Sequence, residues 1–230
     1  MKNRHDPPGP EGNRQGWMMF AHSGPLNLRE LEPEDIHLGD IVHALGRINR
    51  FIGQTREPIS VLWHSVVLTE LLRFERHEFQ LEGLLHDAGE AYVGDWISPL
   101  YGMVDPAIQG LKERIQETVF TAGGLPGRSA LLSKPVRIVD RLLARYESES
   151  EHGYGRPVPW HEPMNGPERE RIQTAIKGIG APSDRYADQE HIRQRFLHKC
   201  NQLLPDDAPL RRTLEEAQRV YRMASTGMTP

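Results

Sequence analysis

The sequence is poor in cysteine, in long apolar runs and in excess positive charge. Its 230 residues contain one cysteine, Cys200, which excludes an intramolecular disulfide and a metal site built from thiolates. No apolar run approaches the roughly 18 residues that a membrane-spanning helix needs. A formal net charge of −4 gives no basic surface for duplex DNA or RNA, although a few local arginines could hold a small anion.

The N-terminal region also lacks the apolar core of a secretory signal, so we expect a cytoplasmic protein. Residues 1–15 are rich in proline, glycine, asparagine and arginine, a composition typical of a disordered tail. Two short apolar segments, residues 17–20 and 26–31, flank a Ser-Gly-Pro turn at residues 23–25. They predict a small hairpin or an extended cap.

From residue 33 onward the apolar residues recur with helical spacing, which predicts a mainly α protein of about seven helices. We expect a core over residues 16–147 and C-terminal helices over 168–230 that pack on it. The polar, Pro/Gly-rich connection at 148–167 is either a functional lid or a flexible linker. The helical patterns cover residues 36–48, 61–74, 78–92, 106–122, 135–146, 168–177, 188–204 and 209–223.

One predicted helix, residues 78–92, carries three side chains that suit metal binding or acid–base chemistry. His86 and Glu90 are four residues apart and Asp87 and Glu90 are three apart, so each pair can meet on a helix surface. The neighbouring leucines form a buried stripe. Burying these polar groups unpaired would be costly, and a divalent cation is a partner that satisfies all of them.

Two more helices place chemically suitable side chains beside their inward faces. His64 shares a face with Val67, Leu68 and Leu71, and Asp140 shares one with Val136 and Leu143. Together with His86 and Asp87, they offer two imidazoles and two carboxylates. Such a shell suits an open site for Mn, Fe, Co, Zn or Mg, and the absence of thiolates argues against structural zinc.

The order of these residues resembles a known superfamily. A histidine, a His-Asp pair, a glutamate three residues after that aspartate, and a distant aspartate occur in the same order in the HD-domain phosphohydrolases. Within that superfamily the chain is most similar to the YfbR-like 5′-deoxynucleotidases and their phage relatives, some of which act on deoxynucleoside triphosphates. The resemblance covers residues 36–147 and implies an all-α helical bundle. Its segments are residues 48–51, 55–65, 84–99 and 139–141.

The resemblance implies a role for each matching residue. Asp87 and Glu90 would be catalytic, with Glu90 positioning a water molecule or passing a proton. Arg50 would clamp the phosphate, with Arg56 as a weaker second candidate. Asp95 would accept a hydrogen bond from the sugar, and Phe51 would pack on the sugar or base. The metal ligands implied by the resemblance are His64, His86, Asp87 and Asp140.

Two positions depart from the family pattern. The cellular enzymes usually carry tryptophan where this chain has Phe51, so the base or sugar preference can differ. They also tend to carry a lysine at the position of Tyr101, so one cation near the phosphates is missing. The second departure leaves open how many phosphates the substrate carries.

We therefore expect a metal-dependent phosphohydrolase that converts a deoxynucleoside 5′-monophosphate to nucleoside and phosphate, and we expect it to be a homo-oligomer. A first alternative is a triphosphohydrolase that releases tripolyphosphate from a deoxynucleoside triphosphate. A second, from a different class, is a nucleotide-binding sensor without turnover that uses residues 147–167 as a partner surface. A cyclic-nucleotide phosphodiesterase is less favoured.

Overall fold

The computed structural model describes residues 15–97, 103–150, 164–182 and 186–225, together with Pro7 and Leu100. The expected disordered tail therefore lies outside the described residues, except for Pro7 and Gln15. The same holds for Tyr101 and for residues 151–163 of the expected lid or linker. None of the described helices is both long enough and apolar enough to cross a membrane.

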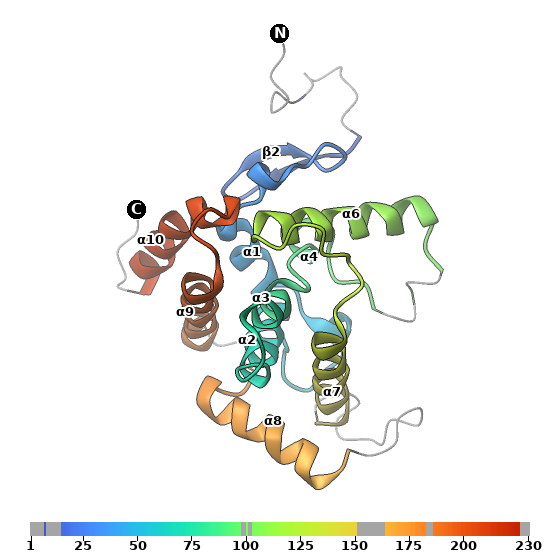
Figure 1. The fold of residues 1–230 in the computed structure, drawn as a ribbon, viewed down its shortest axis with the longest axis vertical. Helices are drawn as coiled ribbons and strands as arrows, with labels where there is room; N and C mark the ends of the chain where they lie inside the picture. Colours follow the sequence, from blue (N-terminus) through green and yellow to red (C-terminus); the bar gives the residue numbers. More distant parts are fainter. Residues whose placement is uncertain are drawn as a thin grey trace.

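The described chain is mostly helical, with one two-stranded sheet, as the sequence predicts (Figure 1). Strands β1 (Trp17–Phe20) and β2 (Gly24–Asn27) form the predicted hairpin, in which Trp17 lies opposite Asn27. Two 3₁₀ turns, η1 (Pro33–Asp35) and η2 (Arg50–Gly53), flank the first helix. The helices are α1 (Leu38–Leu45), α2 (Val61–Leu71), α3 (His77–Leu85), α4 (Glu90–Val93), α6 (Pro106–Ala122), α7 (Lys134–Ser150), α8 (Gly166–Ile179), α9 (Tyr186–Leu203) and α10 (Leu214–Ser225), with a third 3₁₀ turn, η4, at Pro209–Thr213.

Helix α2 is the centre of the fold. It packs against α3, α7, α8 and α9, and Figure 1 shows it beside α3 in the middle of the molecule. Apart from Glu70, all of its residues are buried. A helix that is apolar on nearly all sides belongs in a core, so a polar side chain on α2 is held in the protein interior. His64 is such a side chain.

Several helix ends follow the predicted signals, and others do not. Ser60 accepts a hydrogen bond from the Trp63 amide and caps α2, and α6 begins at Pro106 and ends before Gly123, as predicted. Helix α1 ends at Leu45, so the predicted extension to residue 48 is wrong. Helix α7 continues to residue 150, past its predicted end at 146, because its last residues find partners in the core.

The predicted helix over residues 78–92 is broken in the structure. Helix α3 ends at Leu85 and α4 begins at Glu90, and between them the backbone forms tighter bonds to the third preceding residue, such as Glu90 N–H to Asp87 O. In a continuous helix the Gly89 amide would bind the Leu85 carbonyl. Here the Gln116 side chain inserts between them, accepting from the Gly89 amide at 2.9 Å and donating to the Leu85 carbonyl at 2.8 Å.

Replacing Gln116 with methionine, which has a similar shape, is expected to destabilise the protein by about 1–3 kcal/mol, the cost of leaving buried polar groups unpaired. The measurement is the free energy of unfolding in urea. Gln109→Met on the same helix removes the hydrogen bond from the Gln109 side chain to the Val104 carbonyl at the helix start and serves as the control. Equal losses of unfolding free energy in the two variants would show that the Gln116 amide stabilises the protein no more than a hydrogen bond at a helix start does.

Candidate metal centre

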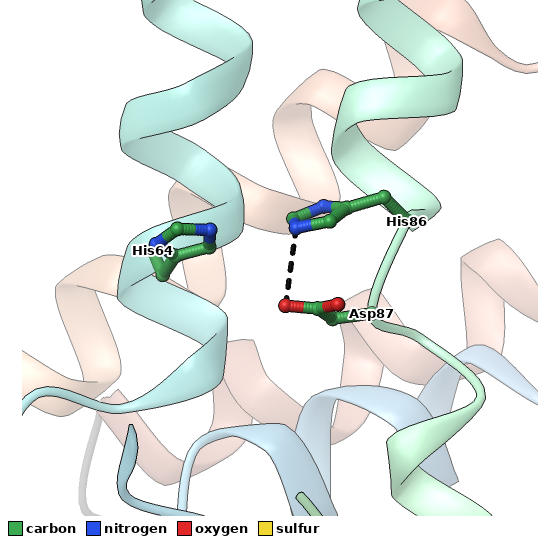
Figure 2. Close-up of side chains that lie close together, drawn as sticks. All are labelled: His64, His86 and Asp87. Atoms are coloured by element: carbon green, nitrogen blue, oxygen red, sulfur yellow. Dashed lines mark ion pairs between the residues drawn. The ribbon is translucent and has the colours of Figure 1, made fainter. Parts of the chain in front are cut away.

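Three side chains meet in the protein interior beside the break between α3 and α4. His64 comes from α2, and His86 and Asp87 come from the four-residue turn after α3. One ligand atom from each of the three lies within 4.8 Å of the others, so they form a group that could hold a metal ion. Figure 2 shows the imidazole of His64, on α2, and that of His86, just after α3, pointing toward each other. Their ring centres are 5.2 Å apart, and the ring planes are tilted by 45°.

The fourth predicted ligand, Asp140 on α7, lies against the same group. Its Oδ1 atom is 3.2 Å from Nε2 of His64 and 3.8 Å from Nε2 of His86. The Oδ2 atom of Asp87 is 3.0 Å from the same His86 nitrogen. The structure thus brings together four side chains that are up to 76 residues apart in the sequence. We refer to His64, His86, Asp87 and Asp140 as the HD cluster.

The charges of the HD cluster are strongly coupled. Burial lowers the pKa of His86, but the facing Asp87 carboxylate outweighs burial and raises this pKa to about 9. Burial raises the pKa of Asp87, and the His86 and Arg50 cations bring it well below its ordinary value. The pKa of Asp140 is also lowered, since its hydrogen bond to His64 overcomes burial. Two carboxylates at this depth thus stay ionised and require cations beside them.

The donor set fits a divalent cation. The Nδ1–H group of His86 donates to the Gly83 carbonyl at 2.8 Å, which leaves Nε2 turned toward the cluster. That nitrogen is buried and has no hydrogen-bond partner among the described residues, although the Asp87 carboxylate is 3.0 Å away. A ring nitrogen and a carboxylate oxygen that face each other without a hydrogen bond can both act as ligands of one cation. Histidine ligands oriented by a second hydrogen bond are typical of protein metal sites.

Glu147 on α7 contacts this site and was not predicted from the sequence. Its Oε1 atom accepts a hydrogen bond from Nδ1 of His64 at 2.7 Å, and its Oε2 atom accepts one from Nε of Arg50 at 2.9 Å. The side chain is 1% exposed. Arg50, a predicted phosphate-binding residue, also contacts Asp87 through Nη1 at 3.3 Å. The arginine is therefore held at the edge of the HD cluster.

The backbone that presents Arg50 is unusual. The next two residues, Phe51 and Ile52, adopt left-handed conformations with φ of 55° and 54°, each at a cost of about 1–2 kcal/mol for a residue with a side chain. Such strain concentrates at functional sites. The Arg50 guanidinium carbon lies 5.7 Å from the centre of the Phe51 ring, so the predicted phosphate-binding and packing residues lie side by side.

Glu90, the first residue of α4, is buried and 6% exposed. One carboxylate oxygen accepts a hydrogen bond from Nζ of Lys112 on α6 at 3.0 Å, and the other has no hydrogen-bond partner in the part of the chain that the structure describes. Burial and the negative charge of Asp87 hold the pKa of Glu90 well above its ordinary value, against the opposing effect of Lys112. Sequence reasoning missed Lys112, because α6 carried no obvious chemistry on its own.

Two further predicted substrate-binding residues are less closely tied to the HD cluster. Asp95 is partly buried after α4, where burial raises its pKa, the Arg50 cation lowers it and Asp87 raises it. The pKa of Asp95 therefore depends on the charges of Arg50 and Asp87. Arg56 is exposed in the loop before α2, and its role as a second phosphate ligand stays a prediction.

Comparison with known proteins gives relatives without a described activity. No family model matches this chain. The chain is 30% identical over 148 residues to an uncharacterized protein of Rhodobacter capsulatus, a match that covers 61% of this chain and 76% of the relative. It is 32% identical over 118 residues to the uncharacterized Escherichia coli protein YfdR, and the match covers 51% and 62%, respectively. Any function must therefore be argued from the site itself.

Proposed function

We propose that this chain, which belongs to the same family as the uncharacterized Rhodobacter capsulatus protein, is a metal-dependent phosphohydrolase of nucleotides. The observation that carries the proposal is the HD cluster, with buried histidines, partly buried carboxylates and a guanidinium at its edge: Asp87 lies 3.0 Å from His86 and 3.3 Å from Arg50. A cation site beside a phosphate-binding arginine is suited to phosphate-ester hydrolysis.

In this proposal the four side chains of the HD cluster hold one divalent cation. When bound, such an ion supplies Lewis acidity to a phosphoryl oxygen and lowers the pKa of a water molecule. The ring orientations of His64 and His86 are fixed beforehand by Glu147 and by the Gly83 carbonyl. The choice among Mn, Co, Fe, Zn and Mg is left open by this mixed nitrogen and oxygen shell.

Arg50 orients the substrate. Its guanidinium is anchored through Nε on Glu147, so its Nη groups can face a phosphate as a planar, charged fork. Phe51 follows on the strained backbone and packs on the sugar or base, while Asp95 accepts a hydrogen bond from a sugar hydroxyl. These three residues position the ester bond over the HD cluster.

Glu90 acts as the general acid that protonates the leaving group. Burial and the charge of Asp87 raise the pKa of Glu90 against the opposing effect of Lys112, which favours its protonated form, and from this form it can donate a proton to the leaving sugar oxygen. The water oxygen forms the new bond to phosphorus as the phosphorus–sugar oxygen bond breaks. Glu90 regains a proton from the water, and the products are nucleoside and orthophosphate.

The charge balance favours a substrate with one phosphate. Among the described residues, more carboxylates than cations surround the site, so one divalent ion leaves it close to neutral or negative. A monophosphate dianion suits such a site better than a triphosphate with about four negative charges. The carboxylates are those of Asp87, Asp95, Asp140 and Glu147, Glu90 being the protonated acid of the proposal, and the side-chain cations are Arg50 and Lys112.

The test is a product assay with metal-stripped protein. Deoxynucleoside 5′-monophosphates and triphosphates are incubated with Mn²⁺, Co²⁺ or Mg²⁺, and the phosphate products are separated. We expect orthophosphate from the monophosphates, only in the presence of a metal ion. Release of tripolyphosphate from a triphosphate would show that the protein is a triphosphohydrolase instead. Binding of metal and nucleotide without any product would show that the protein is a nucleotide sensor without turnover.

A further inference from the structure

Glu147 occupies a position that links the two halves of the proposed site. It is 1% exposed, lies on α7 and has both carboxylate oxygens engaged: one with His64 of the HD cluster and the other with Arg50. Two partners from separate segments, 83 and 97 residues away in the sequence, thus share one carboxylate.

On the His64 side, Glu147 fixes the orientation of a fully buried imidazole. Because the carboxylate can only accept, Nδ1 of His64 must carry the hydrogen of this 2.7 Å bond. Nε2 of the same ring then points at Asp140, 3.2 Å away, inside the HD cluster. A ring held in this way presents the same nitrogen to the cluster at all times.

Through its second oxygen, Glu147 determines which nitrogen atoms of the Arg50 guanidinium can face a phosphate. Its Oε2 atom takes the Nε position at 2.9 Å, so the Nη groups point away from it, and Nη1 reaches Asp87 at 3.3 Å. The Arg50 side chain is only 14% exposed, so it has little freedom to choose another orientation. The bond to Glu147 therefore keeps the fork directed at the place where a phosphate would meet the cluster.

We infer that Glu147 is a positioning residue that couples the metal ligand His64 to the phosphate-binding Arg50. The inference rests on the proposed function. Its chemical basis is that a carboxylate offers two acceptors, whereas the amide of glutamine offers one acceptor and one donor. In Glu147→Gln one of the two contacts must be lost, because the amide nitrogen would face either the Nδ1–H or the Nε–H group.

The experiment is a double-mutant cycle between Glu147→Gln and Arg50→Gln, with two binding readouts. The first is the Kd for Co²⁺ by calorimetry, together with the visible absorption spectrum of the bound ion. The second is the Kd for inorganic phosphate at saturating Co²⁺. Glu149→Gln on the same helix is the matched control, since Glu149 pairs with Arg145 and Arg169 rather than with the cluster.

We expect Glu147→Gln to weaken Co²⁺ binding by about 10- to 100-fold, as for other residues that orient a metal ligand, and to change the Co²⁺ spectrum. Phosphate binding should also weaken. In the Arg50→Gln background the effect of Glu147→Gln on phosphate should disappear, while its effect on Co²⁺ remains. Glu149→Gln should change neither. The double variant removes both members of the Arg50–Glu147 ion pair, so neither charge of that pair is left buried alone, and it reports on the metal even if the single variant unfolds.

Each outcome has a distinct meaning. If Glu147→Gln binds Co²⁺ and phosphate as the unmodified protein does, Glu147 only neutralises Arg50 and the coupling is refuted. If its effect on phosphate is unchanged by Arg50→Gln, the coupling does not pass through the arginine and is likewise refuted. If the unmodified protein binds neither probe, the proposed function fails, and the inference falls with it.

Discussion

Asp87→Asn is expected to weaken divalent-metal binding by at least about 100-fold, because even residues that only orient a ligand change metal affinity by 10- to 100-fold. Asp87 contacts His86 at 3.0 Å and Arg50 at 3.3 Å, so it supplies negative charge to both the HD cluster and the arginine that we propose binds the phosphate. We also expect kcat/KM for a nucleoside monophosphate to fall by about 10³-fold or more, equivalent to several kcal/mol of lost transition-state stabilisation.

Calorimetric titration of metal-stripped protein with Mn²⁺ measures the binding, and orthophosphate release measures the activity. Asp206→Asn is a suitable control, because that aspartate is fully exposed and contacts only Arg211 among the pairs described. The control should behave as the unmodified protein does. An Asp87→Asn protein with unchanged Mn²⁺ affinity would remove Asp87 from the ligand set.

Glu90→Gln is expected to lower kcat by about 10²- to 10⁴-fold, the usual contribution of a positioned general acid or base. The metal affinity and KM should change little, because Glu90 contacts Lys112 rather than the histidines of the HD cluster. Glutamine keeps the shape and one oxygen acceptor for Lys112 but holds no transferable proton. The loss should therefore fall on the chemical step alone.

The measurement is a full kinetic analysis with saturating metal, accompanied by a metal titration. Glu70→Gln provides a matched control, because Glu70 pairs with Lys199 in a similar partly buried ion pair on another part of the fold. Normal kcat in Glu90→Gln would assign the proton transfer to another group. A parallel loss of metal binding would instead make Glu90 part of the cation site.

Much of the helical fold could be predicted because its signals are local. Apolar spacing identified each helical region, Ser60 marked the start of α2, and Pro106 and Gly123 bounded α6. The inward positions of His64 and Asp140 followed from the same spacing. The four ligands were predicted from the order of the residues and its resemblance to a known superfamily. The structure places ligand atoms of His64, His86 and Asp87 within 4.8 Å of one another and Asp140 beside the two histidines.

The break between α3 and α4 could not be read from the sequence. The segment has helical spacing throughout, and its backbone torsions stay in the helical region at His86 and Gly89. What separates the helices is a side chain 31 residues away, Gln116, whose bond to the Leu85 carbonyl competes with the helix. A tertiary contact of this kind has no local signal.

Glu147 was missed for a related reason. The run after Tyr146 alternates glutamate and serine, which favours a polar connection over a helix. The helix continues because the first glutamate of that run is buried against His64 and Arg50, and both partners come from distant segments. The error in the helix boundary thus hid a residue of the site. Lys112 lies within a correctly predicted helix and was missed because its partner, Glu90, is distant in the sequence.

The most direct test of the metal centre is anomalous diffraction from crystals grown with Mn²⁺ or Co²⁺. The account predicts one strong peak about 2.0–2.3 Å from donor atoms of the HD cluster, between the two imidazoles and the two carboxylates. A map without a peak at that position, or with ions only at surface carboxylates, would contradict the central claim.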